Sequence, residues 1–188
     1  MSKKSTIALA LLSLVATSSC QQVNWNPDPA WEKAPVSFDW SGIDPTFDSA
    51  MKSDLAAWNY AAGCKVAVRA KDAASANVVI SAYDGTMCGG SSPNDLDTTP
   101  GAVGGHSRCS PIRAEIKFRE MSDIRSVFVI GLHEMGHALG LAHHDRSEVM
   151  NPSPQLYHPE AFGGGGSARM PMISDWEGAA IGKRYCRK

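Results

Sequence analysis

The chain has 188 residues and 43% of them are hydrophobic, which suits one domain with a buried core rather than two domains or a disordered chain. Its formal net charge of -1 argues against a nucleic-acid-binding protein that works through a basic surface. No apolar run reaches the roughly 20 residues of a membrane-spanning helix, and the 17 glycines and 11 prolines indicate many loops.

The first 20 residues have the order of an export signal. Lys3 and Lys4 precede an apolar stretch over residues 7–16, and small residues follow it. A stretch of this length is typical of a cleaved signal and is too short for a stable anchor. We therefore expect residues 1–20 to direct export from a bacterial cell, with the protein either held in the cell envelope as a lipoprotein or secreted.

The cysteines bear on how this signal ends. Cys20 stands where a bacterial lipoprotein carries its lipidated cysteine, which would attach the chain to a membrane, although cleavage after Ser18 also fits. If Cys20 carries a lipid, an even set remains that can form two disulfides in an oxidising compartment: Cys64, Cys88, Cys109 and Cys186. Three pairings are possible, and the sequence does not choose among them.

The first elements of the mature chain follow from its apolar pattern. Residues 21–35 are polar and contain three prolines, so we expect an extended lead-in, with one domain over 36–188. Apolar and polar side chains alternate over 36–40 and predict a short strand. Over 44–62 the apolar residues recur every three or four positions, which predicts an amphipathic helix that ends at the following glycine.

The middle of the chain is predicted to contain three strands and a long loop. Apolar residues at alternate positions predict strands over 64–70 and 77–83, and a further strand is predicted over 112–118. Residues 84–111 are rich in Gly, Ser, Pro, Asp and Thr. We therefore expect one long irregular connection there.

This predicted connection carries polar residues of the kinds that bind metals. Asp84, Asp95 and Asp97 could hold a structural calcium ion, although they do not follow an EF-hand pattern. His106 is expected to be an exposed loop residue, and the alternative is a ligand of a second structural metal. Cys109 is interpreted as half of a disulfide.

Two helices are predicted in the C-terminal part. A serine or an aspartate just before Ile124 can cap a helix over 124–139. Residues 146–173 are expected to be irregular. A last helix is predicted over 174–185, with Ser174 as its cap and Glu177 completing a capping box.

The first of these helices carries the residues that indicate chemistry. His133 and His137 are four residues apart and lie on one helix face, so both can bind one metal ion. Gly140 permits a sharp turn that would bring His143 back as a third ligand. His144 is the alternative third ligand, but the spacing favours His143. Three protein ligands leave one position of a zinc ion open for water, as in catalytic zinc sites.

Glu134 is the candidate general base. It follows His133 and is therefore offset from the ligand face by about 100° of helix rotation. It is poorly placed to share the metal, but it can reach a water molecule in the open position. A carboxylate there can take the proton of the water and later pass it to a leaving amine.

The segment HEMGHALGLAH over 133–143 matches HExxHxxGxxH and resembles the metzincin zinc endopeptidases. The resemblance implies that Met150 forms the methionine turn (Met-turn) that underlies the zinc in that family. The Met-Asn-Pro sequence that begins at this methionine looks most like that of the matrixin branch. The resemblance also implies an α+β fold, in which a twisted mixed sheet accompanies an active-site helix, the Met-turn and a C-terminal helix.

The resemblance further implies a zinc-dependent endopeptidase that binds its protein or peptide substrate extended along an edge strand. We expect it to act as a monomer. The residues after the third histidine are His144 and Asp145, whereas matrixins usually have Ser or Thr after that histidine. Astacins and serralysins have Tyr two residues after the Met-turn methionine, and here that position is Pro152. Residues 21–35 contain no cysteine for a cysteine-switch propeptide. His158, beyond the Met-turn, could line the pocket for the residue after the cut.

Two other functions fit the same residues. A non-enzymatic zinc-binding surface module with a peptidase fold would need the histidines but not Glu134, so the intact glutamate favours an enzyme. A zinc hydrolase of a small amide or wall peptide would need a short, closed cleft, whereas the metzincin cleft is open.

Overall fold

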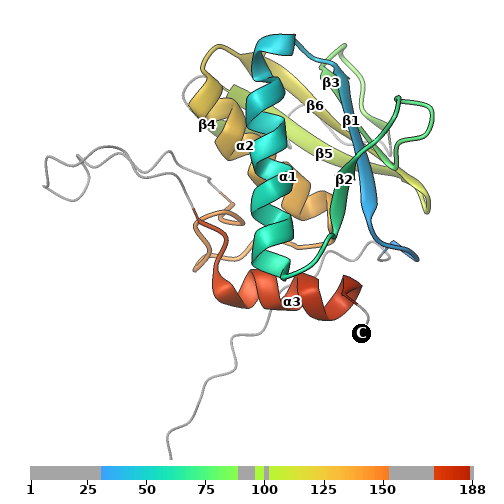
Figure 1. Cartoon of the computed structure of the whole chain (residues 1–188). Helices are drawn as coiled ribbons and strands as arrows, with labels where there is room; N and C mark the ends of the chain where they lie inside the picture. Colours follow the sequence, from blue (N-terminus) through green and yellow to red (C-terminus); the bar gives the residue numbers. More distant parts are fainter. Residues whose placement is uncertain (1–30, 89–95, 100–101, 153–171, 187–188) are drawn as a thin grey trace, which may run out of the picture.

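The computed structural model describes residues 31–88, 96–99, 102–152 and 172–186, drawn in colour in Figure 1. The expected signal over 1–20, Asp95 and His158 lie outside these ranges. No helix within them is long and apolar enough to cross a membrane. The elements in chain order are β1 (Val36–Gly42), η1 (Pro45–Phe47), α1 (Asp48–Ala62), β2 (Ala67–Arg69), β3 (Val78–Ala82), β4 (Asp97–Thr99), β5 (Ala102–Ser110), β6 (Arg113–Met121), α2 (Ile124–Ala138) and α3 (Asp175–Tyr185).

The strands form one mixed sheet of six strands in the order β2-β1-β3-β6-β5-β4. The first four strands of this order are parallel, and β5 and β4 are added antiparallel. Parallel neighbours need a long crossover, and α1 provides it between β1 and β2. The sheet therefore ends in an antiparallel edge formed by the short strand β4.

Helices α1 and α2 pack against each other and against the sheet (Figure 1). The apolar stripe of α1 is buried, as its spacing predicts, and Met51 and Trp58 have no exposed surface. The Trp58 indole donates a buried hydrogen bond of 3.0 Å to the Leu132 carbonyl of α2. Apolar side chains of the central strands, such as Phe38 and Phe118, belong to the same core. This core holds α2 in a fixed position relative to the sheet.

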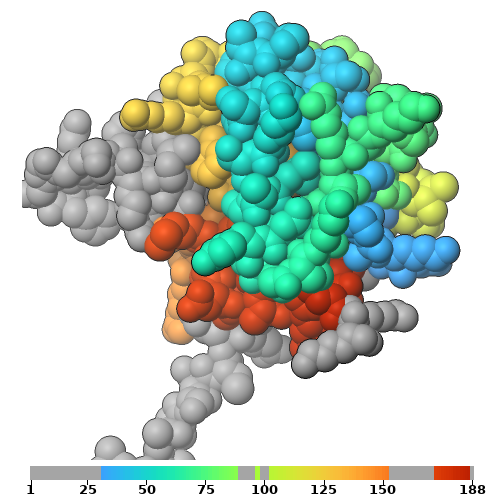
Figure 2. All heavy atoms as spheres, in the orientation of Figure 1, coloured from blue at the N-terminus to red at the C-terminus, as the bar shows by residue number. Residues whose placement is uncertain are grey.

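Helix α3 packs across the end of α1, and Figure 2 shows the two helices in contact on one face of the molecule. The contact is close because Gly178 and Gly182 lie against the carbonyl groups of Ala61 and Ala62. A disulfide between Cys64 and the residue after α3 closes this contact. The predicted capping box at the start of α3 is present, with both of its hydrogen bonds formed.

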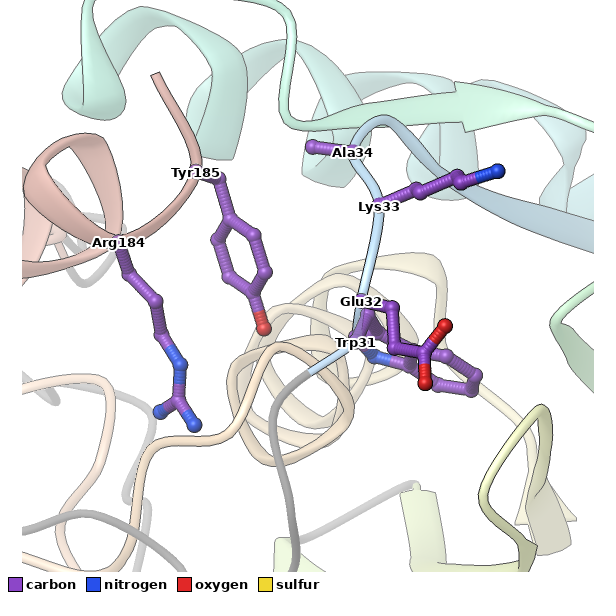
Figure 3. A pocket seen from close by; sticks show the side chains of 6 residues that line it. All are labelled: Trp31, Glu32, Lys33, Ala34, Arg184 and Tyr185. Atoms are coloured by element: carbon purple, nitrogen blue, oxygen red, sulfur yellow. The ribbon is translucent and has the colours of Figure 1, made fainter. Parts of the chain in front are cut away.

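The last carbonyl groups of α2 are capped by aromatic side chains from both ends of the described chain. The Trp31 indole donates to the Ala138 carbonyl at 2.6 Å, and the Tyr185 hydroxyl donates to the Leu139 carbonyl at 2.9 Å. These carbonyls have no partner inside the helix, so the contacts stabilise its end. Trp31 and Tyr185, with Arg184, also line a pocket of about 400 Å³ between the lead-in and α3 (Figure 3).

The prediction of one irregular connection over 84–111 is wrong, because β4 and β5 lie within it. Gly104, Gly105 and the polar residues that follow them have low strand propensity. They form a strand because β5 pairs with β6 from Ala102 opposite Met121 onward. Long-range pairing therefore overrides the local composition, and this strand forms part of the candidate site described next.

Candidate metal centre

Helix α2 begins at a cap and is buried along most of its length. The Asp123 side chain accepts from the Ser126 backbone N–H at 2.9 Å, so the second of the two predicted caps is used. His133 and Glu134 have no exposed surface. Charged or polar side chains inside a core are costly unless they have partners, which makes this stretch of α2 the place to look for a binding site.

The chain turns sharply at Gly140, as the sequence predicts. Gly140 has a φ of 101°, a conformation that favours glycine. The Leu141 backbone N–H donates to the Gly136 carbonyl at 3.0 Å and closes the turn. The turn brings His143 back toward α2. His144 points elsewhere, since its ring packs on Trp176 with the ring centres 4.8 Å apart.

The structure brings the three predicted histidines together. The Nε2 atoms of His133 and His137 lie 3.0 Å apart, those of His137 and His143 3.1 Å, and those of His143 and His133 3.2 Å. Ligand atoms of a tetrahedral zinc site with bonds of about 2.0–2.1 Å are separated by roughly 3.3 Å. The three nitrogen atoms therefore have nearly the spacing of three corners of such a site.

The hydrogen bonds of two rings set the protonation that a metal ligand needs. Nδ1 of His133 contacts the Val149 carbonyl at 2.6 Å, and Nδ1 of His137 contacts the Leu141 carbonyl at 2.8 Å. A carbonyl only accepts, so both Nδ1 atoms carry the hydrogen, and in the neutral rings both Nε2 atoms then present a lone pair. Converging lone pairs repel one another, and a cation between them removes the repulsion. The donor set thus fits zinc.

Burial and neighbouring charge act on the histidines in different directions. Burial, followed by the nearby His133, lowers the pKa of His137 well below its usual value and also lowers the pKa of His143. At His133 burial lowers the pKa, but hydrogen bonding to Asp97 and the charge of Glu134 outweigh it and leave the pKa raised. Neutral imidazole is the form that binds a metal.

The Met-turn lies beneath this cluster. Met150 is buried, and its sulfur packs against Gly136 of α2 next to Trp58. The Ser147 hydroxyl accepts from the Met150 backbone N–H at 2.5 Å and donates to the buried carboxylate of Glu177 at 2.5 Å. Glu177 also caps α3, so one carboxylate joins the turn to the last helix. The turn in this way holds the Val149 carbonyl that orients His133.

Glu134 is buried beside the histidines. Neither of its carboxyl oxygens has a hydrogen-bond partner among the described residues. Burial is the main cause that raises the pKa of Glu134 to about 8; the charge of His133 opposes this rise, and the charge of Asp97 adds to it. Its carboxyl group can therefore hold or release a proton near neutral pH, which a general base requires.

Sequence reasoning missed two residues at this site. An Asp97 carboxylate oxygen lies 3.3 Å from Nε2 of His133, and the other lies 3.9 Å from Nε2 of His143. His106 is in β5 and is not an exposed loop residue: its Nε2 is buried without a partner among the described residues, and its ring stacks on His137 at 6.2 Å. Both residues lie within 84–111, the range predicted to be one irregular connection. Their place beside the histidines depends on the pairing of β4 and β5, which the local sequence does not reveal.

The aspartates considered as calcium ligands do not share a site among the described residues. Asp84 accepts from Lys117 at 2.8 Å, whereas Asp97 joins the histidines. Two of the three possible cysteine pairings are excluded, because Cys88 bonds to Cys109 and the other two cysteines bond to each other. The prediction that Cys109 is half of a disulfide is confirmed.

Comparison with known proteins agrees with this arrangement. A search of curated proteins gave no match. The family model described as matrixin matches residues 30–163, which span the whole sheet, α2, the histidine cluster and the Met-turn. The mixed sheet, the two long helices, the turn and the last helix agree with the predicted α+β metzincin-like fold. The chain therefore belongs to the matrixin family of peptidases.

Proposed function

We propose that this protein is a zinc-dependent endopeptidase that acts outside the cytoplasm. One observation carries the proposal: the Nε2 atoms of His133, His137 and His143 converge within 3.0–3.2 Å of one another beside a buried carboxyl group. The hydrogen bonds to Nδ1 leave lone pairs for a metal, and membership of the matrixin family supports peptide hydrolysis.

In the proposed reaction, His133, His137 and His143 would hold a zinc ion, which would supply a Lewis acid for the scissile carbonyl and for a water molecule. Glu134 takes the proton of that water at a carboxylate oxygen as the water oxygen bonds to the carbonyl carbon. It donates this proton to the amine nitrogen as the C–N bond breaks. Its raised pKa favours the first transfer, since a protonated carboxyl group is stable in this site. The Val149 and Leu141 carbonyls keep the rings of His133 and His137 oriented throughout.

We propose that the substrate binds extended along β4. Among the described residues this strand is the edge of the sheet, and its one pairing partner there is β5. An exposed edge offers backbone N–H and C=O groups to a peptide, which can add one more strand. Asp97 lies on β4 and contacts the histidine cluster, so a peptide on this edge would run close to the metal.

Export is part of the proposal and rests on the sequence of the first 20 residues and on the disulfides. The described residues contain two disulfides, which persist in oxidising compartments. With all four of these cysteines paired, Cys20 is left over, as expected if it carries a lipid. Attachment through Cys20 and release after Ser18 both remain proposals. We also propose that the chain acts as a monomer.

The test separates an enzyme from a non-enzymatic zinc-binding module. Casein is incubated with the zinc-loaded chain, with the chain after chelation, and with the chelated chain after zinc is restored. Glu134→Gln should keep its zinc and lose about 10²–10⁴ of turnover. Glu120→Gln, which changes an exposed glutamate of β6, should leave both unchanged. If Glu134→Gln cleaves as fast as the parent, the base assignment is wrong. If the parent binds zinc but cleaves no casein or other protein, the binding module is favoured.

A further inference from the structure

A fourth side chain points at the centre of the histidine cluster. One ligand atom from each of Asp97, His133, His137 and His143 can be chosen so that all lie within 4.8 Å of one another. The carboxylate oxygen nearest to His133 is 3.3 Å from its Nε2. This distance equals the roughly 3.3 Å between two ligand atoms of a tetrahedral zinc ion. Asp97 thus lies near the corner that the three histidines leave open.

Contacts of β4 and of the residue before it with β5 hold Asp97 beside the histidines. Asp97 pairs with Gly104 of β5, and β5 approaches α2 closely there, since a Cβ on Gly104 would lie 2.7 Å from the Ile130 side chain. The preceding residue, Leu96, packs over Gly105. Neighbouring residues of an extended chain point to opposite faces. Asp97 therefore points toward α2 and the histidines.

The start of the segment that leads to β4 is also fixed. Cys88 is joined by a disulfide to Cys109 of β5, and the Ser107 hydroxyl donates to the Cys88 carbonyl. Strand pairing with β5 supports the position of Asp97, and the disulfide ties Cys88 to the same strand. The side chain of Asp97 is 13% exposed, which leaves it near solvent at the rim of the site.

We propose that Asp97 is a fourth protein ligand of the metal and that it keeps the site closed in the resting protein. This inference rests on the proposed zinc site. A set of four protein ligands is typical of closed sites, whereas a catalytic site keeps one position open. The Asp97 carboxylate must therefore leave before water and substrate can use that position. Because Asp97 lies on the edge strand, a peptide that pairs with β4 is placed to displace it.

The first measurement compares zinc affinity by competition with a chelator, using the full chain. Asp97→Asn should bind zinc about 10–100-fold more weakly than the parent. Asp72→Asn, which changes an exposed carboxylate that accepts from Ser75, should bind zinc as the parent does. Circular dichroism of each variant shows whether the fold is kept. If Asp97→Asn folds and binds zinc as tightly as the parent, the inference is overturned.

The second measurement asks whether the fourth position is filled. The chain is loaded with Co²⁺, whose visible spectrum reports its ligands, and acetate is added as a carboxylate that is not tethered to the chain. In Asp97→Ala, acetate should bind and shift the spectrum toward that of the parent. In the parent, the tethered carboxylate competes, so acetate should bind at least about tenfold more weakly. Equal acetate binding by the two proteins would overturn the inference.

Activity completes the test and separates the two proposals. At saturating zinc, Asp97→Asn should cleave casein at least about twofold faster than the parent, because a closing ligand is gone. Slower cleavage would overturn the closing role. If the parent binds neither zinc nor Co²⁺, the proposed function itself fails and the inference fails with it. If the parent binds zinc and cleaves casein while Asp97→Asn changes neither affinity nor rate, only the inference on Asp97 fails.

Discussion

The metal centre has two sides that the chain builds in different ways. The helix wall consists of residues 133–143, which supply three imidazoles and Glu134 from one continuous stretch. The strand wall consists of Asp97 and His106, which β4 and β5 bring to the same place by pairing. Residues of the helix wall are fixed by helix geometry and one turn. Residues of the strand wall are fixed by contacts between distant parts of the chain.

This difference matters for function. The α2 part of the helix wall is packed between α1, the sheet and the Met-turn, so His133 and His137 cannot move without disturbing the core. The strand wall ends at the edge of the sheet, where β4 has one neighbouring strand in the part of the chain that the structure describes. The ligands proposed to stay with the metal therefore come mainly from the rigid wall. The ligand proposed to leave, Asp97, comes from the wall that can move at lower cost.

The largest effect is expected from the end of the helix wall. His143→Ala should weaken zinc binding more than about 100-fold and abolish turnover, since loss of a ligand exceeds the usual effect of losing a supporting residue. The side chain of His143 is 42% exposed, so the fold should survive. Zinc content after dialysis and cleavage of casein measure the two effects.

His144→Ala is the matched control for His143→Ala. His144 is the next residue, but it accepts from the Arg146 backbone and packs on Trp176 instead of joining the cluster. It should keep zinc affinity and turnover within about threefold of the parent. If His144→Ala loses zinc and His143→Ala keeps it, the third ligand has been assigned to the wrong histidine.

Removing each disulfide should distinguish the effect on the free energy of unfolding from the effect on the strand wall. Cys64 and Cys186 are 122 residues apart, and Cys88 and Cys109 are 21 apart. By the entropy of the closed loop, replacing both cysteines by serine should cost roughly 5 kcal/mol for the first pair and roughly 3 kcal/mol for the second. Denaturant unfolding measures both costs.

Zinc affinity should show the opposite order for the two disulfides. Cys88 and Cys109 support the strand wall, so their loss should weaken zinc binding about tenfold. Loss of Cys64–Cys186 should leave the affinity of the folded protein unchanged, because that bond joins α1 to the end of α3. Equal effects on affinity would show that the strand wall does not depend on its disulfide.

The two walls also differ in how far the sequence predicts them. The spacing of His133, His137 and Gly140 predicts the helix wall because helix periodicity and a left-handed turn are local properties. The capping box of α3 and the apolar stripe of α1 are local as well, and both are confirmed. Asp97 was considered only as a calcium ligand, and His106 only as a loop residue or a second metal ligand.

The reason lies in the composition of β5. Gly104 and Gly105 lack the side chains that mark a strand, and each is required for packing, the first against Ile130 and the second against Leu96. Glycine at these positions allows close approach but removes the alternating pattern that predicts strands. The register of β5 on β6 thus depends on contacts that a single sequence does not display.

Stability should depend on pH through two buried titratable groups, one packed against α2 behind the helix wall and one in the strand wall. Asp54 of α1 lies against Gly131 of α2, and both of its carboxyl oxygens lack a partner among the described residues. Burial raises the pKa of Asp54 well above its usual value. Burial, with a smaller effect of Arg108, lowers the pKa of His106 to about 4.

The two groups should affect stability in opposite directions. Native Asp54 keeps a proton that the unfolded chain releases above about pH 4, so its contribution to stability is lost as pH rises. Native His106 lacks a proton that the unfolded chain binds below about pH 6.5, so its contribution is lost as pH falls toward 4.

Unfolding free energies measured between pH 4 and 8 test both directions. Relative to the parent, Asp54→Asn, which cannot ionise, should lose less stability between pH 4 and pH 8, so its advantage should grow as pH rises. His106→Phe should gain up to about 3 kcal/mol at pH 4, from a shift of 6.5 to about 4 at 1.36 kcal/mol per pKa unit. Parallel pH curves for the parent and either variant would contradict that assignment.

The smallest expected effect comes from the same substitution made in each wall. Gly136→Ala in α2 places a Cβ against the Met150 sulfur and Trp58, both buried. Overpacking costs about 1–3 kcal/mol, and alanine recovers up to about 1 kcal/mol of helix propensity, so the net loss should be about 1–2 kcal/mol. Gly105→Ala in β5 meets the half-buried Leu96 and should cost less than about 1 kcal/mol.

A double-mutant cycle identifies the contact responsible in the helix wall. If Gly136→Ala acts by pushing the Met-turn away from α2, Met150→Ala should make room for the new methyl group. The double variant should then be more stable than the sum of the two single changes by about 0.5–3 kcal/mol. Additive effects would mean that Gly136 is required for another reason, such as its contact with Trp58. Because the Met-turn also positions the Val149 carbonyl on His133, the cycle should appear in zinc affinity as well as in stability.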